Sequence, residues 1–178
     1  MPKLIKDAKE SILREAKRLL IENGFASLNM RTVASNAGIA SGTLYNYFPS
    51  KDHIVVSVML EDWNAALRQM EAEIPNATTA IEGLEIVFQK IQSFSETYRA
   101  TWRSFRGEKD FPWIREKYHK ALIDQLCEQL LPLGNRFGFL FDPTALPFLS
   151  EVLLTGAAHP QGQFSYLRPC LKRIVGEQ

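Results

Sequence analysis

Residues 30–52, MRTVASNAGIASGTLYNYFPSKD, constrain the fold of this chain more than any other stretch. Apolar residues recur at helical spacing in two short segments, which predicts two helices joined by a tight turn. Asn29 is the expected N-cap of the first helix, because its side-chain oxygen can accept a backbone N–H that lacks a partner. Gly38 is expected to end that helix, since glycine adopts the left-handed conformation without a Cβ clash. Pro49 is expected to stop the second helix because it has no N–H to continue the ladder.

The second short helix is predicted over residues 42–48, capped by Ser41, and its two faces differ in chemistry. Leu44 and Phe48 lie four residues apart on the expected inner face. The outer face carries polar residues without an acidic group, and small residues stand at its N-terminal end. Such a helix suits close approach to the major groove of DNA, and the spacing with a glycine in the turn is that of a helix-turn-helix.

The run GIASGTLYNYFPSKD resembles the signature of the TetR family of bacterial transcriptional regulators, with a match at each patterned position. The upstream run ILREAKRLLIENGFASLNMRTVASNAG resembles the first helix of that family and its link to the second helix. Met30 departs from the β-branched residue that this family often has before the Arg. The resemblance implies an all-α fold, with a helix-turn-helix DNA-binding domain over residues 1–50 and a helical effector-binding and dimerisation domain over residues 51–178.

The resemblance also implies which residues bind the DNA operator. Some are placed to contact bases and others, among them Lys51, to hold phosphates, and Arg31 is the best candidate for a bidentate contact to guanine. The alternative is a three-helix bundle whose polar face is only solvated. Separately, Tyr45 is expected either on the DNA face or partly buried. The DNA-binding residues expected in this way are Arg31, Thr32, Ser41, Gly42, Thr43, Tyr45, Asn46, Tyr47 and Lys51.

The rest of the chain shows helical spacing, and no segment has the alternation of a strand. Long helices are expected at 6–23, 51–74 and from a Thr79–Glu82 capping box to Gly107. A further helix is expected from Pro112 until Pro132 and Gly134 close it, followed by an irregular segment over 135–141. Asp142, with Pro143 as first residue, is expected to cap the next helix, and a last helix is expected over 164–175, interrupted or begun at Pro169.

Aromatic residues are frequent in the predicted body. They indicate either a pocket for a small apolar or aromatic effector or an ordinary helix-bundle core. The family resemblance implies an effector pocket without saying which residues line it. The candidates for ligand binding are Trp63, Phe88, Tyr98, Trp102, Phe105 and Tyr118, and Trp113 belongs to the same aromatic set.

The segment 146–158 is apolar and ends in small residues, which permit close approach of a second helix. It is expected either to be a buried core helix or to form a homodimer, since TetR-like proteins pair through their last two long helices and a palindromic operator needs a two-fold protein. The residues predicted at the dimer interface are Leu149, Val152, Leu153, Gly156, Ala157 and Leu171.

Charge and composition narrow the classes of function. Residues 1–51 carry eight Lys and Arg against four Asp and Glu, whereas the remainder carries thirteen against sixteen, which suits a DNA-binding head on an acidic body. Lys3, Lys6 and Asp7 stand where a signal peptide would need apolar residues, so the chain is expected in the cytoplasm with Cys127 and Cys170 as free thiols. No membrane association, metal site or cofactor is expected from the spacing of its residues.

The sequence therefore predicts a ligand-responsive transcriptional regulator that is not an enzyme, and in particular a homodimeric repressor released from its operator by a small molecule. Two alternatives remain open at this point. One is an architectural DNA-binding protein without an effector. The other is an enzyme with catalysis in the body, against which stands the absence of a nucleophile–base pair, a Walker loop or a metal cluster.

Overall fold

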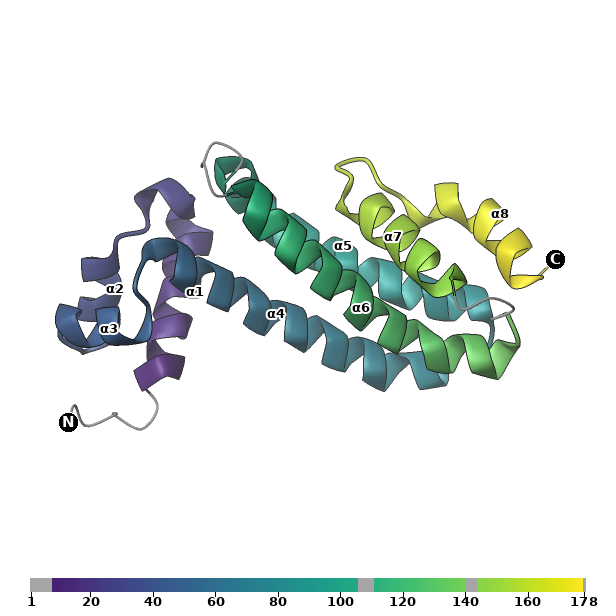
Figure 1. Cartoon of the computed structure of the whole chain (residues 1–178), viewed down its shortest axis with the longest axis horizontal. Helices are drawn as coiled ribbons and strands as arrows, with labels where there is room; N and C mark the ends of the chain where they lie inside the picture. Colours follow the sequence, from purple (N-terminus) through teal and green to yellow (C-terminus); the bar gives the residue numbers. More distant parts are fainter. Residues whose placement is uncertain (1–7, 106–110, 140–143, 178) are drawn as a thin grey trace. The chain divides into compact units, whose positions relative to one another are not determined.

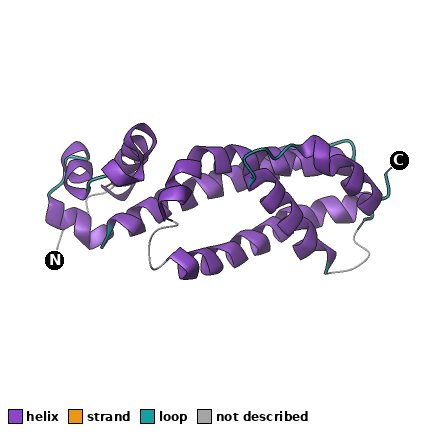
Figure 2. Cartoon of the chain, turned by 90° about the horizontal axis from the view of Figure 1, so that it is seen from above, coloured by secondary structure: helices purple, strands orange, loops and turns teal. Residues whose placement is uncertain are grey.

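The computed structural model describes residues 8–105, 111–139 and 144–177, and all regular elements among them are helices (Figures 1 and 2). This confirms the predicted all-α fold. None of the described helices combines the length and the apolar character needed to cross a membrane. The elements are α1 (Ala8–Ser27), α2 (Met30–Asn36), α3 (Ser41–Tyr47), α4 (Lys51–Glu73), the 3-10 helix η1 (Ile74–Asn76), α5 (Ala80–Phe105), α6 (Phe111–Phe137), α7 (Ala145–Ala158) and α8 (Phe164–Val175).

The first compact unit contains α1, α2, α3, the part of α4 up to Trp63 and the part of α5 from Tyr98 onward. Helix α1 packs against α2, and α2 packs against α3. Because α1 turns one apolar stripe inward, it forms the base of a small core, whose most buried members include Ile12, Leu13, Val33, Leu44, Ile54, Val55 and Trp63. The division of the compact units inside α4 agrees with a long helix that begins in the DNA-binding part, while the domain boundary at residue 50 stays a prediction.

The second compact unit contains the rest of α4 and α5 together with the described parts of α6, α7 and α8. Helix α6 packs along α7, and α7 packs against α8. Its fully buried side chains include Met70, Leu84, Phe88, Ile91, Leu126, Leu130 and Leu153. This core is apolar at nearly every position, so burial of hydrocarbon surface is its main source of stability.

The N-terminus of α5 is closed by carboxylates from two places in the chain. The predicted capping box is present in part: the Glu82 N–H donates to Thr79 Oγ1 at 3.1 Å, but Glu82 Oε2 accepts from the N–H of Thr78 at 2.6 Å and its hydroxyl at 2.8 Å. These bonds, above all the one from the Thr78 N–H, lower the pKa of Glu82. Glu177 Oε1 accepts the Ala80 N–H at 2.7 Å, a contact between segments far apart in sequence that helical spacing does not predict.

The helix ends differ from the expectation at three places. Ser41 is the first residue of α3 and Ala40 stands at the N-cap without a side-chain hydrogen bond, so the predicted Ser41 cap is wrong. Helix α6 passes through Pro132 and Gly134 to Phe137, and Gly138, with a φ of 71°, follows it. Pro169 likewise lies inside a continuous α8.

The continuation of α6 has a physical reason in the residues around Pro132. Leu130 and Leu133 are completely buried. Full burial of a leucine contributes about 1.5–3 kcal/mol, and the two together offset the roughly 3 kcal/mol that a proline costs inside a helix. The expected irregular segment therefore begins later than predicted, while the predicted capping residues Asp142 and Pro143 lie outside the described residues and α7 begins at Ala145.

Candidate nucleic-acid interface

The turn between α2 and α3 is held by backbone and cap bonds. Asn29 Oδ1 accepts the Arg31 N–H at 2.8 Å, which confirms Asn29 as the N-cap of α2. Gly38 has a φ of 69°, and the N–H of Ile39 donates to the Ala34 carbonyl at 3.0 Å. A left-handed glycine followed by this bond is the usual end of a helix, and here it directs the chain into α3.

Helix α3 is anchored on one side only. Leu44 is completely buried and Phe48, just beyond the last turn, is 4% exposed. Tyr45 is 48% exposed, so about half of its side chain is accessible on this face. Ser41, Gly42 and Asn46 are exposed, whereas Thr43 and Tyr47 are half-buried at the edges of this face.

Helix α2 contributes two of the predicted DNA contacts. Arg31 and Thr32 are exposed at its first turn, next to the buried Met30 and Val33. Because the Asn29 cap fixes the backbone of Arg31, its long guanidinium-bearing side chain starts from a defined point on the surface. The exposed faces of α2 and α3 thus belong to one rigid helix pair that presents donors and acceptors without an acidic side chain.

Lys51, predicted to hold a phosphate, begins α4 and rests on the end of α1. Its Nζ lies 4.2 Å from the centroid of the Phe25 ring and donates to the Ala26 carbonyl at 3.3 Å. Gly24, with a φ of 74°, breaks the regular helix just before these two residues, as expected from the sequence, and turns them toward α4. The ammonium is thus held where the end of α1 meets the start of α4.

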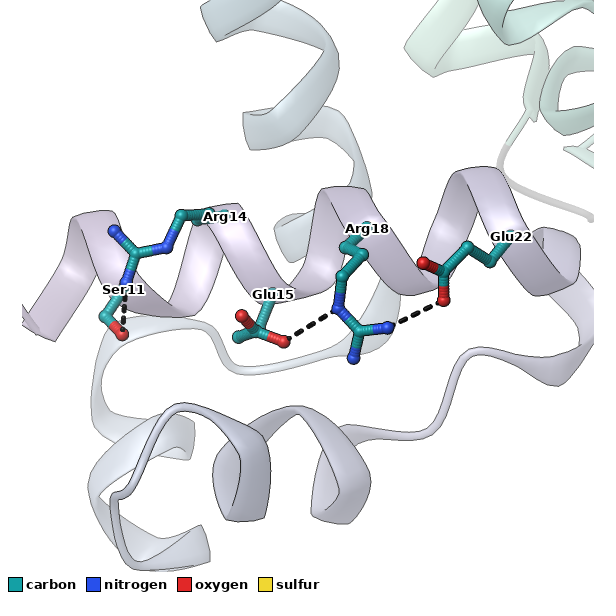
Figure 3. A network of polar contacts seen from close by, with 5 residues as sticks. All are labelled: Ser11, Arg14, Glu15, Arg18 and Glu22. Carbon is teal, nitrogen blue, oxygen red and sulfur yellow. Dashed lines mark hydrogen bonds and ion pairs between the residues drawn. The ribbon is translucent and has the colours of Figure 1, made fainter.

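The outward face of α1 carries a row of paired charges (Figure 3). Arg18 donates from Nε to Glu15 at 3.1 Å and from Nη1 to Glu22 at 2.7 Å, and Arg14 donates to the Ser11 hydroxyl at 3.3 Å. The bond to Glu15, and next the one to Glu22, raise the pKa of Arg18. Two carboxylates beside one guanidinium leave this part of α1 with little net positive charge, which sets it apart from the α2–α3 face.

A partly buried polar contact joins three helices of the same compact unit. Asp62 on α4 accepts from Lys17 Nζ of α1 at 2.6 Å through Oδ1 and from the Tyr98 hydroxyl of α5 at 2.5 Å through Oδ2. Burial, and then the hydrogen bond to Asp62, raise the pKa of Tyr98 far above its usual range, so its hydroxyl stays protonated and donates. Sequence reasoning missed Asp62; the signal was a carboxylate directly before the buried Trp63.

The aromatic residues predicted to bind a ligand do not gather at one place among the described side chains. Trp63, Phe88 and Tyr98 are each 1% exposed and belong to the cores of two different units. The Phe88 ring packs against Phe164 with centroids 5.5 Å apart, and Tyr118 is half-buried. The side chains of Trp102, Phe105 and Trp113 lie outside the described residues, so ligand binding by this set stays a prediction.

An open pocket of about 480 Å³ lies where α7 ends and α8 begins. It is lined by Gly156, His159, Gln161, Gly162, Gln163, Tyr166 and Leu167. Gln92 of α5 donates from Nε2 to the Gly162 carbonyl at 2.8 Å and so fixes the loop that forms its floor. None of the ligand-binding residues expected from the sequence lines this pocket.

The residues predicted at the dimer interface divide into two groups. Leu149, Leu153, Ala157 and Leu171 are at most 3% exposed, so their side chains pack inside this chain. Val152 and Gly156 are half-buried. The large apolar side chains exposed on the same two helices are Phe148, Tyr166 and Ile174, at 61%, 70% and 42%.

Metal-binding groups and disulfides were also sought. No three His, Cys, Asp or Glu side chains within the described ranges are arranged to hold a metal ion. Cys127 is half-buried beside Ser150, with 3.4 Å between sulfur and hydroxyl, and Cys170 is exposed on α8, both as free thiols.

The fold and the exposed face of the α2–α3 pair define a helix-turn-helix protein. Residues 12–58 match the family model described as "Bacterial regulatory proteins, tetR family". The match is confined to this N-terminal part of the chain, where it agrees with the resemblance to the TetR family found in the sequence.

Curated relatives match over the same part of the chain. A fatty acid metabolism regulator protein of Bacillus subtilis (strain 168) is 34% identical over 79 residues, which are 44% of this chain and 41% of that protein. The HTH-type transcriptional repressor KstR of Rhodococcus jostii (strain RHA1) is 30% identical over 86 residues, or 48% of this chain and 40% of the repressor. The matches thus span about two-fifths of the length of each relative.

Solved structures extend the likeness of fold to nearly the whole chain. The transcriptional regulator FadR from Bacillus subtilis in complex with stearoyl-CoA has a TM-score of 0.60 at 20% identity, covering 93% of this chain and 96% of that one. A transcriptional regulator from Cytophaga hutchinsonii ATCC 33406 has a TM-score of 0.65 at 17% identity, covering 96% of each chain. At such identities the likeness concerns the fold alone.

Proposed function

We propose that this protein is a ligand-responsive transcriptional regulator, in particular a repressor, that binds a palindromic DNA operator as a homodimer in the cytoplasm. The observation that carries the proposal is the geometry of α3: Leu44 and Phe48 anchor one side, while the other side offers exposed, non-acidic hydrogen-bonding groups. Two such helices in a two-fold dimer would enter successive major grooves about 34–36 Å apart.

The proposed effector is a small apolar or aromatic molecule bound by the second compact unit. Support comes from the names of similar proteins, one a fatty acid metabolism regulator and one a FadR structure that contains stearoyl-CoA. An effector can release DNA only if it binds the released conformation better than the DNA-bound one. At saturating effector, the operator affinity of such a repressor therefore falls by the ratio of the effector affinities for the released and the DNA-bound conformation.

The direct test is selection of bound sequences from random duplexes with the full chain, followed by release of the best sequence with a panel of acyl-CoA thioesters and aromatic compounds. We expect a palindromic consensus and release by at least one apolar compound. Binding that no compound changes would favour an architectural DNA-binding protein. A chain that ignores every duplex at low ionic strength would overturn the proposal.

Arg31 and Lys51 are expected to have different roles at the operator. Arg31→Ala should weaken binding by about 1–3 kcal/mol and relax the preference at one base position, because a bidentate base contact is lost. Lys51→Ala should weaken all sequences similarly and reduce the slope of log affinity against log salt by about 1, since one phosphate contact disappears. Anisotropy titrations on the selected operator and a scrambled duplex measure both effects, and the reverse pattern would exchange the two assignments.

For the homodimer, the exposed apolar residues of α7 and α8 are the better candidates to meet a partner than the buried residues predicted from sequence. Tyr166 and Ile174 lie eight residues apart and thus share one face of α8. We expect Phe148→Glu combined with Tyr166→Glu to convert the dimer into monomers, because two charges would be buried in an apolar contact. Sedimentation measures the mass, and Leu131→Glu on α6, at a site 45% exposed, is the control that should stay dimeric.

A further inference from the structure

The three residues Lys17, Asp62 and Tyr98 form a contact that the proposed DNA face does not use. All three lie in the compact unit that contains the helix-turn-helix, yet they come from α1, α4 and α5. Both oxygens of one carboxylate are engaged: Lys17 Nζ lies 2.6 Å from Oδ1 and the Tyr98 hydroxyl 2.5 Å from Oδ2. Asp62 is therefore an acceptor through which α1 and α5 are both attached to α4.

Burial makes this contact hard to replace with water. The Tyr98 side chain is 1% exposed, and Thr101, one turn further along α5, is 4% exposed, so this segment of α5 faces the core of the unit. The Asp62 side chain is 24% exposed and the Lys17 side chain 43%. A buried hydroxyl that loses its acceptor keeps the full cost of leaving water, whereas a surface ion pair would lose little.

The contact also has a directional effect that apolar packing lacks. The inner face of α1 is formed by residues such as Ile12, Leu13 and Ala16, and the hydrophobic attraction between apolar surfaces of this kind is non-directional. A charge-assisted hydrogen bond fixes distance and angle. Because α1 supports α2, and α2 supports α3, the position of α1 decides where the DNA-contacting face points.

We propose that Asp62 and Tyr98 are positioning residues for DNA binding, which hold α1 in register with the C-terminal turns of α5. The inference rests on the proposed function as a DNA-binding regulator and adds the route by which α5 influences the DNA face. Helix α5 is continuous from Ala80 to Phe105, and its residues up to Thr97 belong to the other compact unit. A displacement of α5 along its axis therefore pulls on the Tyr98 hydroxyl and, through Asp62, on Lys17 of α1.

The test uses the full chain and an operator obtained by selection from random duplexes. Tyr98→Phe removes only the hydroxyl, Lys17→Met removes the ammonium, and Lys17→Arg keeps a donor for the carboxylate. Lys90→Met is the matched control, since Lys90 makes an ion pair of the same 2.6 Å length with Glu73 in the other unit. Operator affinity is measured by anisotropy at a temperature well below the thermal midpoint of every variant, so that loss of folded protein does not enter.

We expect Tyr98→Phe and Lys17→Met each to weaken operator binding about three- to tenfold. The double variant should bind the operator as well as the single variant with the lower affinity, because residues in one network are coupled. Lys17→Arg should restore most of the affinity, Lys90→Met should leave it unchanged, and Tyr98→Phe should leave the salt slope unchanged. If Tyr98→Phe does not fold, the operator affinity of Asp62→Asn, which lacks the carboxylate charge, tests the same contact. Unchanged affinity in Tyr98→Phe, or strictly additive losses, would overturn the inference, whereas a wild-type chain that binds no duplex would overturn the proposed function instead.

Discussion

Leu44→Ala and Tyr45→Ala, neighbouring substitutions in α3, should both abolish tight operator binding, but for opposite reasons. Leu44 is completely buried, so its truncation should destabilise the DNA-binding unit by about 2–5 kcal/mol through lost burial and a residual cavity. Tyr45 is 48% exposed, so its truncation should change stability by no more than about 0.5 kcal/mol while removing a side chain from the DNA face. Circular-dichroism melting curves and anisotropy titrations on the selected operator separate the two effects.

A conservative variant provides the control for this pair. Leu44→Met preserves volume and should cost less than about 1.5 kcal/mol, with operator binding retained. If Tyr45→Ala lowered the melting temperature as much as Leu44→Ala, the exposed face of α3 would be part of the core. If Leu44→Ala left operator affinity intact, the packing of α3 against the core would not matter for DNA binding.

Local signals in the sequence predicted the helix ends and the buried side of α3, because these depend on residues close by in the sequence. Asn29 caps α2 and Gly38 ends it because a cap and a left-handed glycine act within a few residues of their own position. The anchored side of α3 follows equally from the spacing of Leu44 and Phe48. The Ser41 cap was wrong because the backbone of Ala40 closes the first turn of α3 without help from a side chain.

Contacts between segments far apart in the sequence could not be predicted from these local signals. Helix α6 continues through Pro132 because buried leucines on both sides outweigh the local penalty, and periodicity alone cannot weigh the two. The Glu177 carboxylate at the start of α5 and the Asp62 contact join residues at least 36 positions apart. For α7 the sequence likewise left a buried core helix and a dimer interface open, because helical spacing shows which residues are apolar, not which surface covers them.

Gly162→Ala should destabilise the second compact unit, because there is no room for a Cβ. An ideal Cβ on Gly162 would lie 1.9 Å from the Gly156 carbonyl oxygen and 3.1 Å from the His159 carbonyl oxygen. Both obstacles are backbone atoms, so the α7–α8 loop itself must move, and the Gln92 bond to the Gly162 carbonyl moves with it. Overpacking of this kind costs about 1–3 kcal/mol. A loss of that size lowers the melting temperature by roughly 2–12 °C for a chain of this length.

Two other glycines give a graded comparison for this prediction. A Cβ on Gly156 would meet the flexible end of Leu167 at 2.8 Å, so Gly156→Ala should be milder than Gly162→Ala. A Cβ on Gly42 would meet nothing within 4 Å, and Gly42→Ala should leave stability unchanged or raise it by up to about 1 kcal/mol through helix propensity. The same methyl group on the DNA face should nevertheless weaken operator binding, since it holds the start of α3 away from the groove. Equal melting temperatures for the three variants would show that steric room in the α7–α8 loop does not limit stability, and unchanged operator affinity in Gly42→Ala would remove the start of α3 from the DNA interface.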